Sequence, residues 1–431
     1  MSFFGKPVKP EDVFTPRNAA VNEEMYIDRP DLETALEQGL RTPLNLVLFG
    51  DSGTGKSWLY KKHFADHKIT YLVANLATAG RLGGISNLLS NLVQRGGAAS
   101  LVSYETNKEA GLNIPVASAS IAQSNTYEVG SKEPFELALE FIRKEAGRGQ
   151  AVLIFDNLEV IYGNDAYMKE LGSILILCDD ATYAQYKVKV MLVGVPSGVK
   201  DYFYNVENLS TVASRLKELP EVDRLTADKC DDLVYRGFSE KLEYEIKDLA
   251  ELQRHVRWVS GRIPLLVHEY CLELAFIAQK NGGVVDSEAI SSADLAWLEQ
   301  KHMPAYRVIE SHMNDLTTSA GRRNQTLFCL SLVKEDQFKY SDIEALLRQE
   351  FPTSTSEIQL NASQILSGLA KTPNPLIKRT PKGDAFTFFS PIYRMVLRTM
   401  LVKTSDERVE KRSASDSARS RAESSDHSTY G

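Results

Sequence analysis

One segment limits what this chain can fold into more than any other: residues 50–57 read GDSGTGKS and fit the pattern G-x-x-x-x-G-K-[ST]. This pattern indicates a phosphate-binding loop where a strand precedes it and a helix follows it. Both neighbours are predicted here, because residues 44–50 read LNLVLFG and a helix is expected from about Lys56. The chain is therefore expected to contain an α/β domain built around this P-loop, and a plain glycine-rich turn is a weak alternative.

The residue types of the P-loop suit the binding of a nucleoside triphosphate. Its glycines let consecutive backbone N–H groups turn inward around the phosphates, and the following helix adds the positive end of its dipole. Lys56 is expected to neutralise charge on the β- and γ-phosphates, and the Ser57 hydroxyl to ligate Mg²⁺. The residues expected to bind the nucleotide are Gly50, Asp51, Ser52, Gly53, Thr54, Gly55, Lys56 and Ser57.

A second apolar run, AVLIFD at residues 151–156, ends in a carboxylate well after the P-loop. A carboxylate at such a strand end can hold the shell of a Mg²⁺ ion, which is the Walker-B role. Strands often end in aspartate, so the run is informative only in combination with the P-loop. Together the two motifs predict Ser57 and Asp156 as metal-binding residues and ATP with Mg²⁺ as cofactors.

The first three parts of the chain differ in pattern. Residues 1–30 form an irregular N-terminal segment. Residues 31–222 alternate helix-like stretches with short apolar runs, which is typical of a parallel sheet covered on both faces and predicts an α/β P-loop domain. Residues 223–320 read as helices only, such as 239–259 and 264–280. The apolar runs expected to be strands are 44–50, 69–76, 151–156 and 188–195.

Residues 321–403 follow the order helix, helix, helix, hairpin, helix, which is typical of a winged helix. The first three helices are expected at 322–333, from the capping box 341–344, and from the capping box 356–359 to about Lys371. The strands of the hairpin are expected at 376–379 and 385–389, and the last helix from Pro391. From residue 404 large apolar side chains are almost absent, so 404–431 are predicted to be a disordered tail. The expected fold class is thus α/β, with an all-helical region and a C-terminal winged helix.

The composition excludes several classes of protein. With 43% hydrophobic and 25% charged residues among 431, the chain is expected to be globular and to hold more than one domain. No apolar run reaches the ~18–20 residues that span a bilayer, and no signal pattern begins the chain, so a cytoplasmic protein with no membrane partner is expected. The four cysteines form no CxxC pair, which suggests neither a zinc site nor disulfides. The net charge is −7, yet residues 321–403 hold 12 Lys and Arg against 7 Asp and Glu, so a polyanion could bind there.

The P-loop domain, the helical region and the winged helix together resemble the AAA+ ATPases of the origin-recognition and initiator type. They are also similar to bacterial relatives among transposition regulators and signal-transducing (STAND-class) NTPases. The resemblance extends over about residues 14–403 and is most specific at the P-loop and Asp156. It implies an ATPase whose helical region is a lid and whose ATP lies at the subunit interfaces of a homo-oligomer.

The resemblance also implies nucleotide-binding residues outside the P-loop. The segment from Tyr26 to Arg29 resembles the one that packs on adenine, so both residues are expected to bind the cofactor. The segment 260–264 resembles the part of the lid that touches the nucleotide. There Arg262 could act as a second sensor, or Pro264 could simply cap the helix.

Two more segments resemble functional positions of the family. Residues 212–216 resemble the segment with the arginine finger, in which Arg215 would stabilise charge on the transferring γ-phosphoryl group. A solvated helix residue is an equal alternative for Arg215. Residues 194–197 lie where the family has a polar sensor, and Ser197 is the only candidate there.

One departure from the family concerns the general base. Most active AAA+ proteins have a glutamate directly after the Walker-B aspartate, whereas this chain has Asn157, and its next acid is Glu159. Asparagine cannot accept a proton from water, although it can orient the water. Binding of ATP is thus better supported than hydrolysis. Either Glu159 is the base, or turnover is slow and the protein is a nucleotide-held switch.

The winged helix points to duplex DNA as a partner, because the third helix of such modules enters the major groove and the wing meets the backbone. The polar residues that could read base edges are Gln359, Asn361, Ser363 and Gln364, and the basic wing residues are Lys378, Arg379 and Lys382. The helix has no Lys or Arg before Lys371, so docking of a protein is only slightly less favoured. The Gly-, Ala- and Ser-rich insertion 96–132 is expected to be a surface loop.

Two functions therefore remain open. The first is an AAA+ ATPase that assembles on DNA and uses Arg215 in trans. The second is a signalling or anti-phage defence NTPase that docks a separate effector protein through its winged helix, because no effector module remains within the 431 residues.

Overall fold

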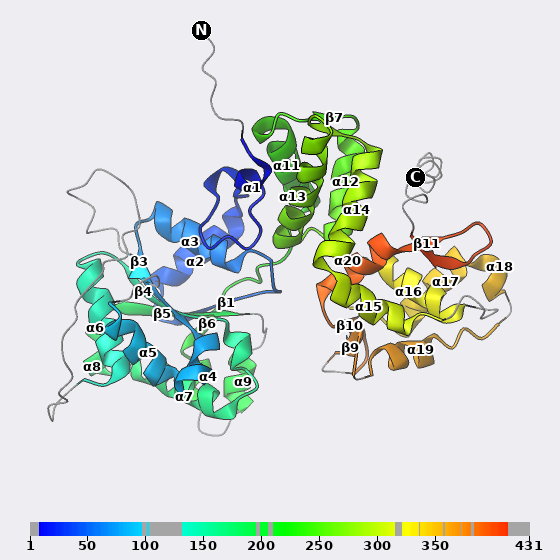
Figure 1. Ribbon diagram of the computed structural model, residues 1–431. Coiled ribbons are helices and arrows are strands. Elements are labelled where there is room, and N and C mark those ends of the chain that lie inside the picture. The colour runs from blue at the N-terminus through cyan, green and yellow to red at the C-terminus, as the bar shows by residue number, and fades with distance from the viewer. Residues whose placement is uncertain are drawn as a thin grey trace, which may run out of the picture. The chain divides into compact units, whose positions relative to one another are not determined.

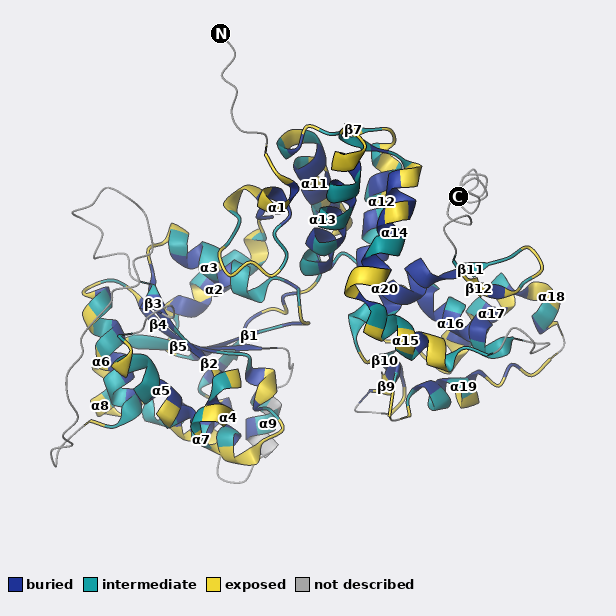
Figure 2. Ribbon diagram, in the orientation of Figure 1, coloured by how far each residue is buried: buried dark blue, intermediate teal, exposed yellow. Residues whose placement is uncertain are grey.

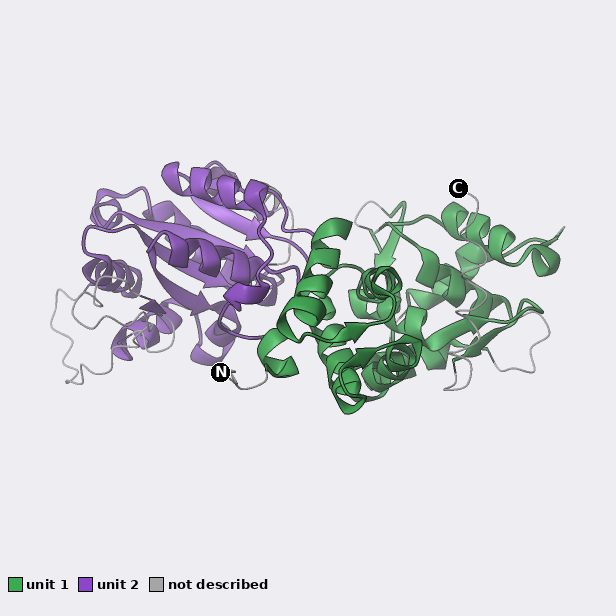
Figure 3. Cartoon of the chain, turned by 90° about the horizontal axis from the view of Figure 1, so that it is seen from above, with its two compact units in different colours: residues 1–17, 225–431 green, residues 18–224 purple. Residues whose placement is uncertain are grey.

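The computed structural model describes residues 8–96, 101–102, 132–194, 199–205, 210–314, 321–335, 337–356, 358–371, 373–380 and 383–412 (Figure 1). The chain forms two compact units (Figure 3). One consists of residues 18–224 and is called the P-loop unit below. The other combines residues 1–17 with 225–431 and is called the helical unit. The change of unit between 224 and 225 lies two residues from the predicted change of pattern.

The P-loop unit contains a six-stranded sheet in the order β3-β2-β4-β5-β1-β6. Every pair of neighbours is parallel except β2 with β3. The strands are β1 Asn45–Phe49, β2 Thr70–Asn75, β3 Leu101–Val102, β4 Ala151–Asp156, β5 Val188–Gly194 and β6 Leu216–Glu218. The predicted α/β class is confirmed, and each of the four predicted runs forms a strand of this sheet. The short strands β3 and β6 were not predicted.

Successive side chains of a strand point to opposite faces of the sheet, and apolar side chains on both faces explain why helices cover both. Leu46 and Leu48 of β1 pack with α2 (Pro30–Arg41) and α3 (Lys56–Asp66) on one face. Val47 points to the other face, which is covered by α5 Ile85–Gln94, α6 Pro134–Ala146 and α7 Asp165–Leu177. Figure 2 shows the strands as buried between these helices. The shorter elements of the unit are η1 Glu23–Met25, η2 Leu76–Thr78, α4 Ala79–Leu82, η3 Leu158–Val160, α8 Ala181–Ala184, α9 Val199–Asn205 and α10 Ser210–Ala213.

The first part of the helical unit differs from the prediction in one place. The single helix expected at 239–259 is wrong, because the chain turns between η4 (Arg236–Lys241) and α12 (Leu249–Ser260). Glu243 has a left-handed φ of 53°, and the Asp248 carboxylate accepts a hydrogen bond from Glu251 N at 2.9 Å, which caps α12. The region is also not helical throughout, since β7 Glu245–Ile246 pairs with β8 Val284–Val285. Its other helices are α1 Pro10–Val13, α11 Ala227–Tyr235, α13 Pro264–Lys280, α14 Ser287–Lys301 and α15 Met303–His312.

The C-terminal part of the helical unit has its own apolar core. Its elements are α16 Arg322–Leu332, α17 Tyr340–Glu350, α18 Pro352–Thr355, α19 Ala362–Leu369, β9 Ile377–Arg379, β10 Phe386–Phe388 and α20 Pro391–Met400. Strands β9 and β10 are antiparallel, and Phe338 forms a bridge with Phe386 on the other side of β10. The short helix α18 is an addition to the expected order, which is otherwise observed, and the winged-helix assignment stays a prediction.

Two predicted helix starts in this part are wrong. The box 356–359 does not open the third helix: α18 ends at Thr355, and α19 begins only at Ala362, after Asn361 with a left-handed φ of 52°. Helix α17 begins at Tyr340, one residue before the expected cap. The Asp342 carboxylate accepts a hydrogen bond from Lys339 N at 2.7 Å, so an aspartate closes that end instead of the predicted serine and glutamate.

The predicted start of the tail at residue 404 is also wrong. Strand β12 (Val409–Lys411) pairs with β11 (Leu401–Lys403), and Val409 is buried in the C-terminal core. In the turn between them, the Glu407 carboxylate accepts hydrogen bonds from Thr353 N at 2.9 Å and Ser354 N at 2.8 Å. These contacts order the segment despite its polar composition. The remainder of the expected tail, 413–431, lies outside the described residues.

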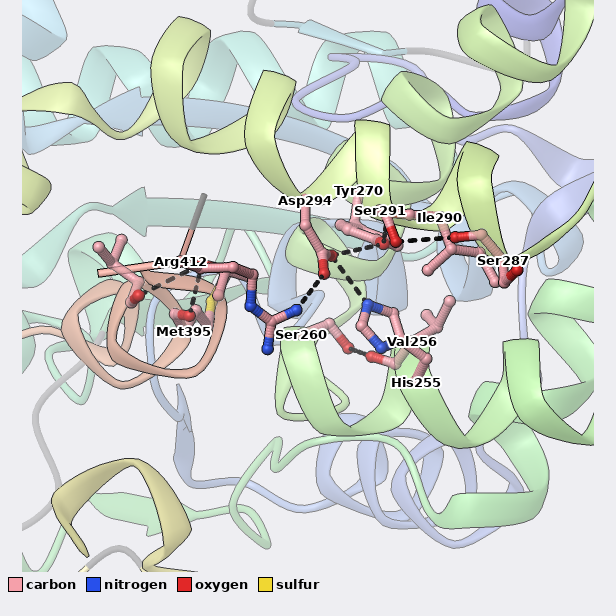
Figure 4. Close-up of polar contacts among 12 residues, drawn as sticks. His255, Val256, Ser260, Tyr270, Ser287, Ile290, Ser291, Asp294, Met395 and Arg412 are labelled. Atoms are coloured by element: carbon pink, nitrogen blue, oxygen red, sulfur yellow. Dashed lines mark hydrogen bonds and ion pairs between the residues drawn. The ribbon is translucent and has the colours of Figure 1, made fainter. Parts of the chain in front are cut away.

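Arg412, the last described residue, contacts a buried carboxylate, that of Asp294 (Figure 4). Asp294 of α14 has no exposed surface; its Oδ1 lies 2.8 Å from His255 Nε2 and accepts a hydrogen bond from Tyr270 Oη at 2.8 Å. Arg412 donates to Oδ2 at 3.3 Å. One carboxylate therefore joins α12, α13, α14 and the end of β12. None of the described helices has the length and apolarity needed to cross a membrane.

Candidate nucleotide-binding site

The P-loop connects β1 to α3, and its conformation depends on glycine. Gly53 and Gly55 have φ of 85° and 95°, values that side chains other than glycine rarely adopt. At Gly50 the restriction is steric, because a Cβ there would lie 2.3 Å from the carbonyl oxygen of Val222. The segment that leaves the P-loop unit thus runs directly against the first residue of the P-loop.

Lys56, the first residue of α3, holds its ammonium group inside the loop. Nζ donates hydrogen bonds to the carbonyl oxygens of Gly50 at 2.7 Å and Asp51 at 2.8 Å. Burial lowers the Lys56 pKa, and the nearby charges of Glu159 and Asp156 oppose that shift. The loop therefore holds a positive charge where a phosphate group would bind.

Asp156 ends β4 next to the P-loop. Partial burial raises the pKa of its carboxyl, whereas a hydrogen bond from Asn157 N at 2.8 Å and the charges of Lys61 and Lys56 lower it. With the Ser57 hydroxyl, it offers oxygen ligands of the kind that Mg²⁺ prefers. In the described part of the chain, no group of three His, Cys, Asp or Glu could hold a metal by itself. A Mg²⁺ ion that shares its coordination between one carboxylate, a hydroxyl and phosphates fits this donor set.

Asn157 and Glu159 occupy different positions beside this site. Asn157 has a left-handed φ of 61°, and its Nδ2 donates a hydrogen bond to Asn75 Oδ1 at 2.8 Å. Glu159 extends toward the end of β5, where a Cβ on Gly194 would lie 3.0 Å from its Oε2. Since β1, β2, β4 and β5 are parallel, their carboxyl ends bring the P-loop, Asn75, Asp156 and Gly194 to one edge of the sheet.

The structure brings Arg29 to the P-loop and buries Tyr26. Arg29 donates from Nη1 to the Asp223 carbonyl oxygen at 2.8 Å, and its Nη2 would lie 3.8 Å from a Cβ on Gly55. Tyr26 Oη donates a hydrogen bond to Glu33 Oε1 at 3.0 Å, and burial is the main cause that raises its pKa. Of these two predicted cofactor-binding residues, Arg29 therefore has the polar group beside the loop.

Arg215 lies at the opposite edge of the sheet. It lies between α10 and β6 and so is not in a helix, and its carbonyl oxygen accepts a hydrogen bond from Asn45 N at the start of β1. The five residues of β1, roughly 16 Å of strand, separate this position from the P-loop. Arg215 Nε forms an ion pair with Asp179 at 2.6 Å, so the side chain is not a solvated helix residue.

The remaining predicted residues lie in the helical unit or outside the described residues. Arg262 has a left-handed φ of 63° and donates to the Leu225 carbonyl oxygen at 3.1 Å, and Pro264 opens α13. Their contact with a nucleotide stays a prediction. Ser197 and most of the insertion 96–132 lie outside the described residues.

The residues predicted to bind DNA are only partly brought together. Gln364 is exposed on α19, whereas Gln359 precedes that helix and cannot lie on its groove-facing side as predicted. Lys378 and Arg379 are exposed on β9, and Lys382 lies outside the described residues. The Arg379 guanidinium stacks 4.8 Å from the Phe386 ring centre and donates to Ser367 Oγ at 3.2 Å, which ties the strand to α19.

Sequence reasoning missed two residues of the site, Asn75 and Tyr60. Asn75 could have been found, because it ends a predicted strand and so reaches the same edge as Asp156. Tyr60 follows Ser57 by three residues and therefore lies on the same face of α3.

The comparisons with known proteins agree with this geometry. Residues 40–203, which include the P-loop and Asp156, match the family model of the AAA domain. No curated protein matches the chain. Among solved structures, a Walker-type ATPase of Pyrococcus abyssi has 16% identity and a TM-score of 0.50, covering 86% of this chain and 96% of its own. Similar structures also include ORC2 of Aeropyrum pernix (12% identity, TM-score 0.46) and Cdc6p of Pyrobaculum aerophilum (13%, 0.43), each covering 91% of this chain and 97% of its own.

Residues 40–203 are thus similar to the AAA domain. The likeness to the Pyrococcus ATPase shows a shared fold. The predicted resemblance to AAA+ ATPases is thus confirmed for residues 40–203 by the match to the AAA domain model.

Proposed function

We propose that this chain binds ATP with Mg²⁺ and acts as a nucleotide-dependent AAA+ assembly switch. The observation that carries the proposal is the Lys56 ammonium, held within the P-loop by Gly50 and Asp51 and bordered by the carboxylates of Asp156 and Glu159. Phosphate oxygens would replace the two carbonyl oxygens as acceptors for Lys56. Bound Mg²⁺ would neutralise part of the phosphate charge from the side of Ser57 and Asp156.

The chain's own groups suggest slow hydrolysis. The Asn157 amide can orient a water but cannot take its proton, and its Nδ2 is already bonded to Asn75. The Glu159 carboxylate lies beside the end of β5 on the same edge and is the proposed general base. Glu159→Gln should lower single-turnover hydrolysis by about 10²–10⁴-fold with ATP affinity unchanged. Equal rates in the variant and the wild type would exclude Glu159 as the base.

Arg215 is proposed to act on the nucleotide of a neighbouring subunit in a homo-oligomer, because it lies a strand's length from its own P-loop. Release from Asp179 would free its guanidinium for a γ-phosphate. A mixture of Arg215→Ala and Lys56→Ala proteins should regain part of the hydrolysis that each lacks alone. No recovery in the mixture would argue against action in trans.

The direct test of the proposed function is the affinity for ATP. Lys56→Ala removes a charged hydrogen-bond donor to phosphate and should weaken binding roughly 10- to 150-fold, from about 1.5–3 kcal/mol. Lys62→Ala is the matched control, since Lys62 lies on the same helix and bonds Asp66. Trp58, two residues after Lys56, offers a fluorescence readout beside calorimetry. Unchanged affinity in folded Lys56→Ala would overturn the proposal.

Duplex DNA is the proposed partner for assembly, supported by the exposed Lys378 and Arg379 of β9. With Lys382 they would neutralise about three phosphates, which predicts a log–log salt slope near about −2.7. Replacing all three by alanine should remove this slope, and ATP should raise apparent affinity by assembling several copies on one duplex. Absence of binding at low salt with ATP would favour docking of a separate effector protein instead.

A further inference from the structure

We propose that a pocket between α2 and α3 of the P-loop unit binds a guanidinium group, such as that of an arginine side chain. The pocket has a volume of about 250 Å³, which is below the ~300–1,000 Å³ of sites for drug-sized ligands. It therefore suits a group of the size of one side chain. None of residues 50–57 lines it, so the proposal goes beyond the binding of ATP and does not depend on it.

His63 of α3 is the residue that points to a ligand. It lines the pocket, yet only 5% of the residue is exposed. Within the described part of the chain, neither of its ring nitrogens has a hydrogen-bond partner. Burial, followed by the neighbouring His67, lowers the pKa of His63, so the imidazole is neutral near pH 7 and keeps an acceptor nitrogen. Buried polar groups without a partner are uncommon, and an N–H group of a ligand would supply one here.

A second imidazole lies directly against the first. The rings of His63 and His67 stack with their centres 4.2 Å apart and an angle of 30° between their planes. His67 Nδ1 lies 2.8 Å from the carbonyl oxygen of His63. Because a carbonyl oxygen can only accept, Nδ1 carries the proton, and Nε2 of the neutral ring is left as an acceptor. Both imidazoles therefore offer acceptor nitrogens to the same pocket.

The lining of the pocket is acidic. It contains four carboxylates against one ammonium group, namely Asp28, Glu33, Glu37 and Asp66 against Lys62. Lys62 bonds Asp66 at 2.6 Å and 2.7 Å, and the exposed Arg41 bonds Glu37. Glu33 Oε1 accepts hydrogen bonds from two donors without charge, a tyrosine hydroxyl and a backbone N–H, both at 3.0 Å. Among the described residues Glu33 forms no ion pair, so a cation in the pocket would compensate its charge.

A guanidinium fits these groups better than an ammonium does. It presents five N–H donors in one plane and stacks on aromatic rings, whereas an ammonium is a compact point charge. The acceptors belong to different helices, with the imidazoles on α3 and the Glu33 carboxylate on α2 (Figure 1). Donors spread over a plane can bond groups of both helices at once, and the imidazole rings offer a face for stacking.

Titration of the full-length protein with arginine amide tests the proposal. The imidazole NMR signals of His63 and His67 should shift with a Kd on the order of 1 mM, as expected for so small a ligand. Lysine amide should bind more weakly. A capped Ala-Arg-Ala peptide distinguishes two sources of the group. Equal affinity for both arginine probes would support recognition of the side chain alone, and tighter binding of the peptide would support a protein as the source.

Two substitutions each remove one contact while keeping the shape of the pocket. Glu33→Gln removes the charge on α2, and His63→Phe keeps a buried ring without nitrogens. Each should weaken binding of arginine amide by about 10-fold or more, measured through the His67 signals, since each removes a partner of a charged donor. Asp31→Asn is the matched control, because Asp31 lies on the same helix and outside the lining of the pocket.

The affinity of His63→Phe for ATP separates this proposal from the proposed function. It should equal that of the wild type, because the pocket shares no residue with the P-loop. Failure of the wild type to bind ATP would overturn the proposed function and leave the pocket unaffected. Unshifted imidazole signals in the wild type, equal losses in Asp31→Asn and Glu33→Gln, or equal affinity for lysine amide would overturn the guanidinium site.

Discussion

Asp156 and Asp294 are carboxylates withdrawn from solvent in different units, and they differ in the partners that compensate their charge. Asp294 is fully buried, yet His255, Arg412 and Tyr270 outweigh that burial and hold its pKa below the usual value. At Asp156 partial burial prevails and the pKa is raised. The lysines beside it, Lys56 and Lys61, donate to backbone carbonyl oxygens.

The difference separates a structural carboxylate from one suited to a ligand. Asp294 has its compensating charges within the chain, so it stabilises the fold and offers nothing to a partner. The chain compensates the charge of Asp156 only in part, and a bound cation would compensate the remainder.

The largest effect is expected from Asp294→Ala. The substitution leaves Arg412 and His255 withdrawn from water without their common partner, which should cost about 3–5 kcal/mol of unfolding free energy. Urea denaturation followed by circular dichroism measures the loss. Asp406→Ala removes an aspartate from the exposed pair with Arg408 and is the matched control, with little change expected. Equal losses of unfolding free energy in both variants would show that the buried Asp294 contributes no more to stability than the exposed Asp406.

Asp156→Asn should have the opposite effect on the unliganded protein. The amide still accepts from Asn157 N while avoiding the cost of a desolvated charge, so stability should stay equal or rise. The wild type should gain about 2.7 kcal/mol at ATP–Mg²⁺ concentrations of 100 times Kd, and the variant should lose the metal-dependent part of that gain. A variant less stable without ligand would contradict the view of Asp156 as a carboxylate kept for a cation.

Sequence could predict much of the Asp156 site and none of the Asp294 cluster, for a physical reason. A P-loop and a strand end are local patterns, and parallel pairing brings their ends to one edge. Asp294, by contrast, meets residues 39, 24 and 118 positions away, and only packing selects them. The false helix at 239–259 and the misplaced start of α19 share one cause, since each break depends on a residue with positive φ, Glu243 or Asn361.

The left-handed conformation of Asn361 also explains why Gln359 lies outside the helix predicted to face the DNA groove. Its capping pattern is local and correct in form, yet Asn361 adopts the left-handed region and starts the helix later. Asn157 also has a positive φ, which turns its amide toward Asn75. Asparagine adopts the left-handed region more readily than most residues. A local capping pattern can therefore predict the wrong helix start when a nearby asparagine adopts that conformation.

The smallest expected effect is the pH dependence of the unfolding free energy, which should differ in sign between Asp156 and Asp294. Asp294 has a folded pKa below 3.8, so its stabilisation is present above that pH and is lost as the pH falls through the folded value. Asp156 has a folded pKa above 3.8, so its ionisation costs stability, and this cost grows as the pH rises from 3.8 through the raised value. Each group changes stability by at most about 1.4 kcal/mol per pH unit.

Urea denaturation at several pH values can resolve these opposite signs. The advantage of Asp156→Asn over the wild type should increase as the pH rises from about 4 toward neutrality. The deficit of Asp294→Ala should stay constant over that range and shrink only in more acidic solution, where the wild type itself loses the carboxylate charge. If the two differences changed in the same direction between pH 4 and 7, the two aspartates would not be compensated differently. A flat profile for Asp156→Asn would mean that Lys56 and Lys61 already offset its burial.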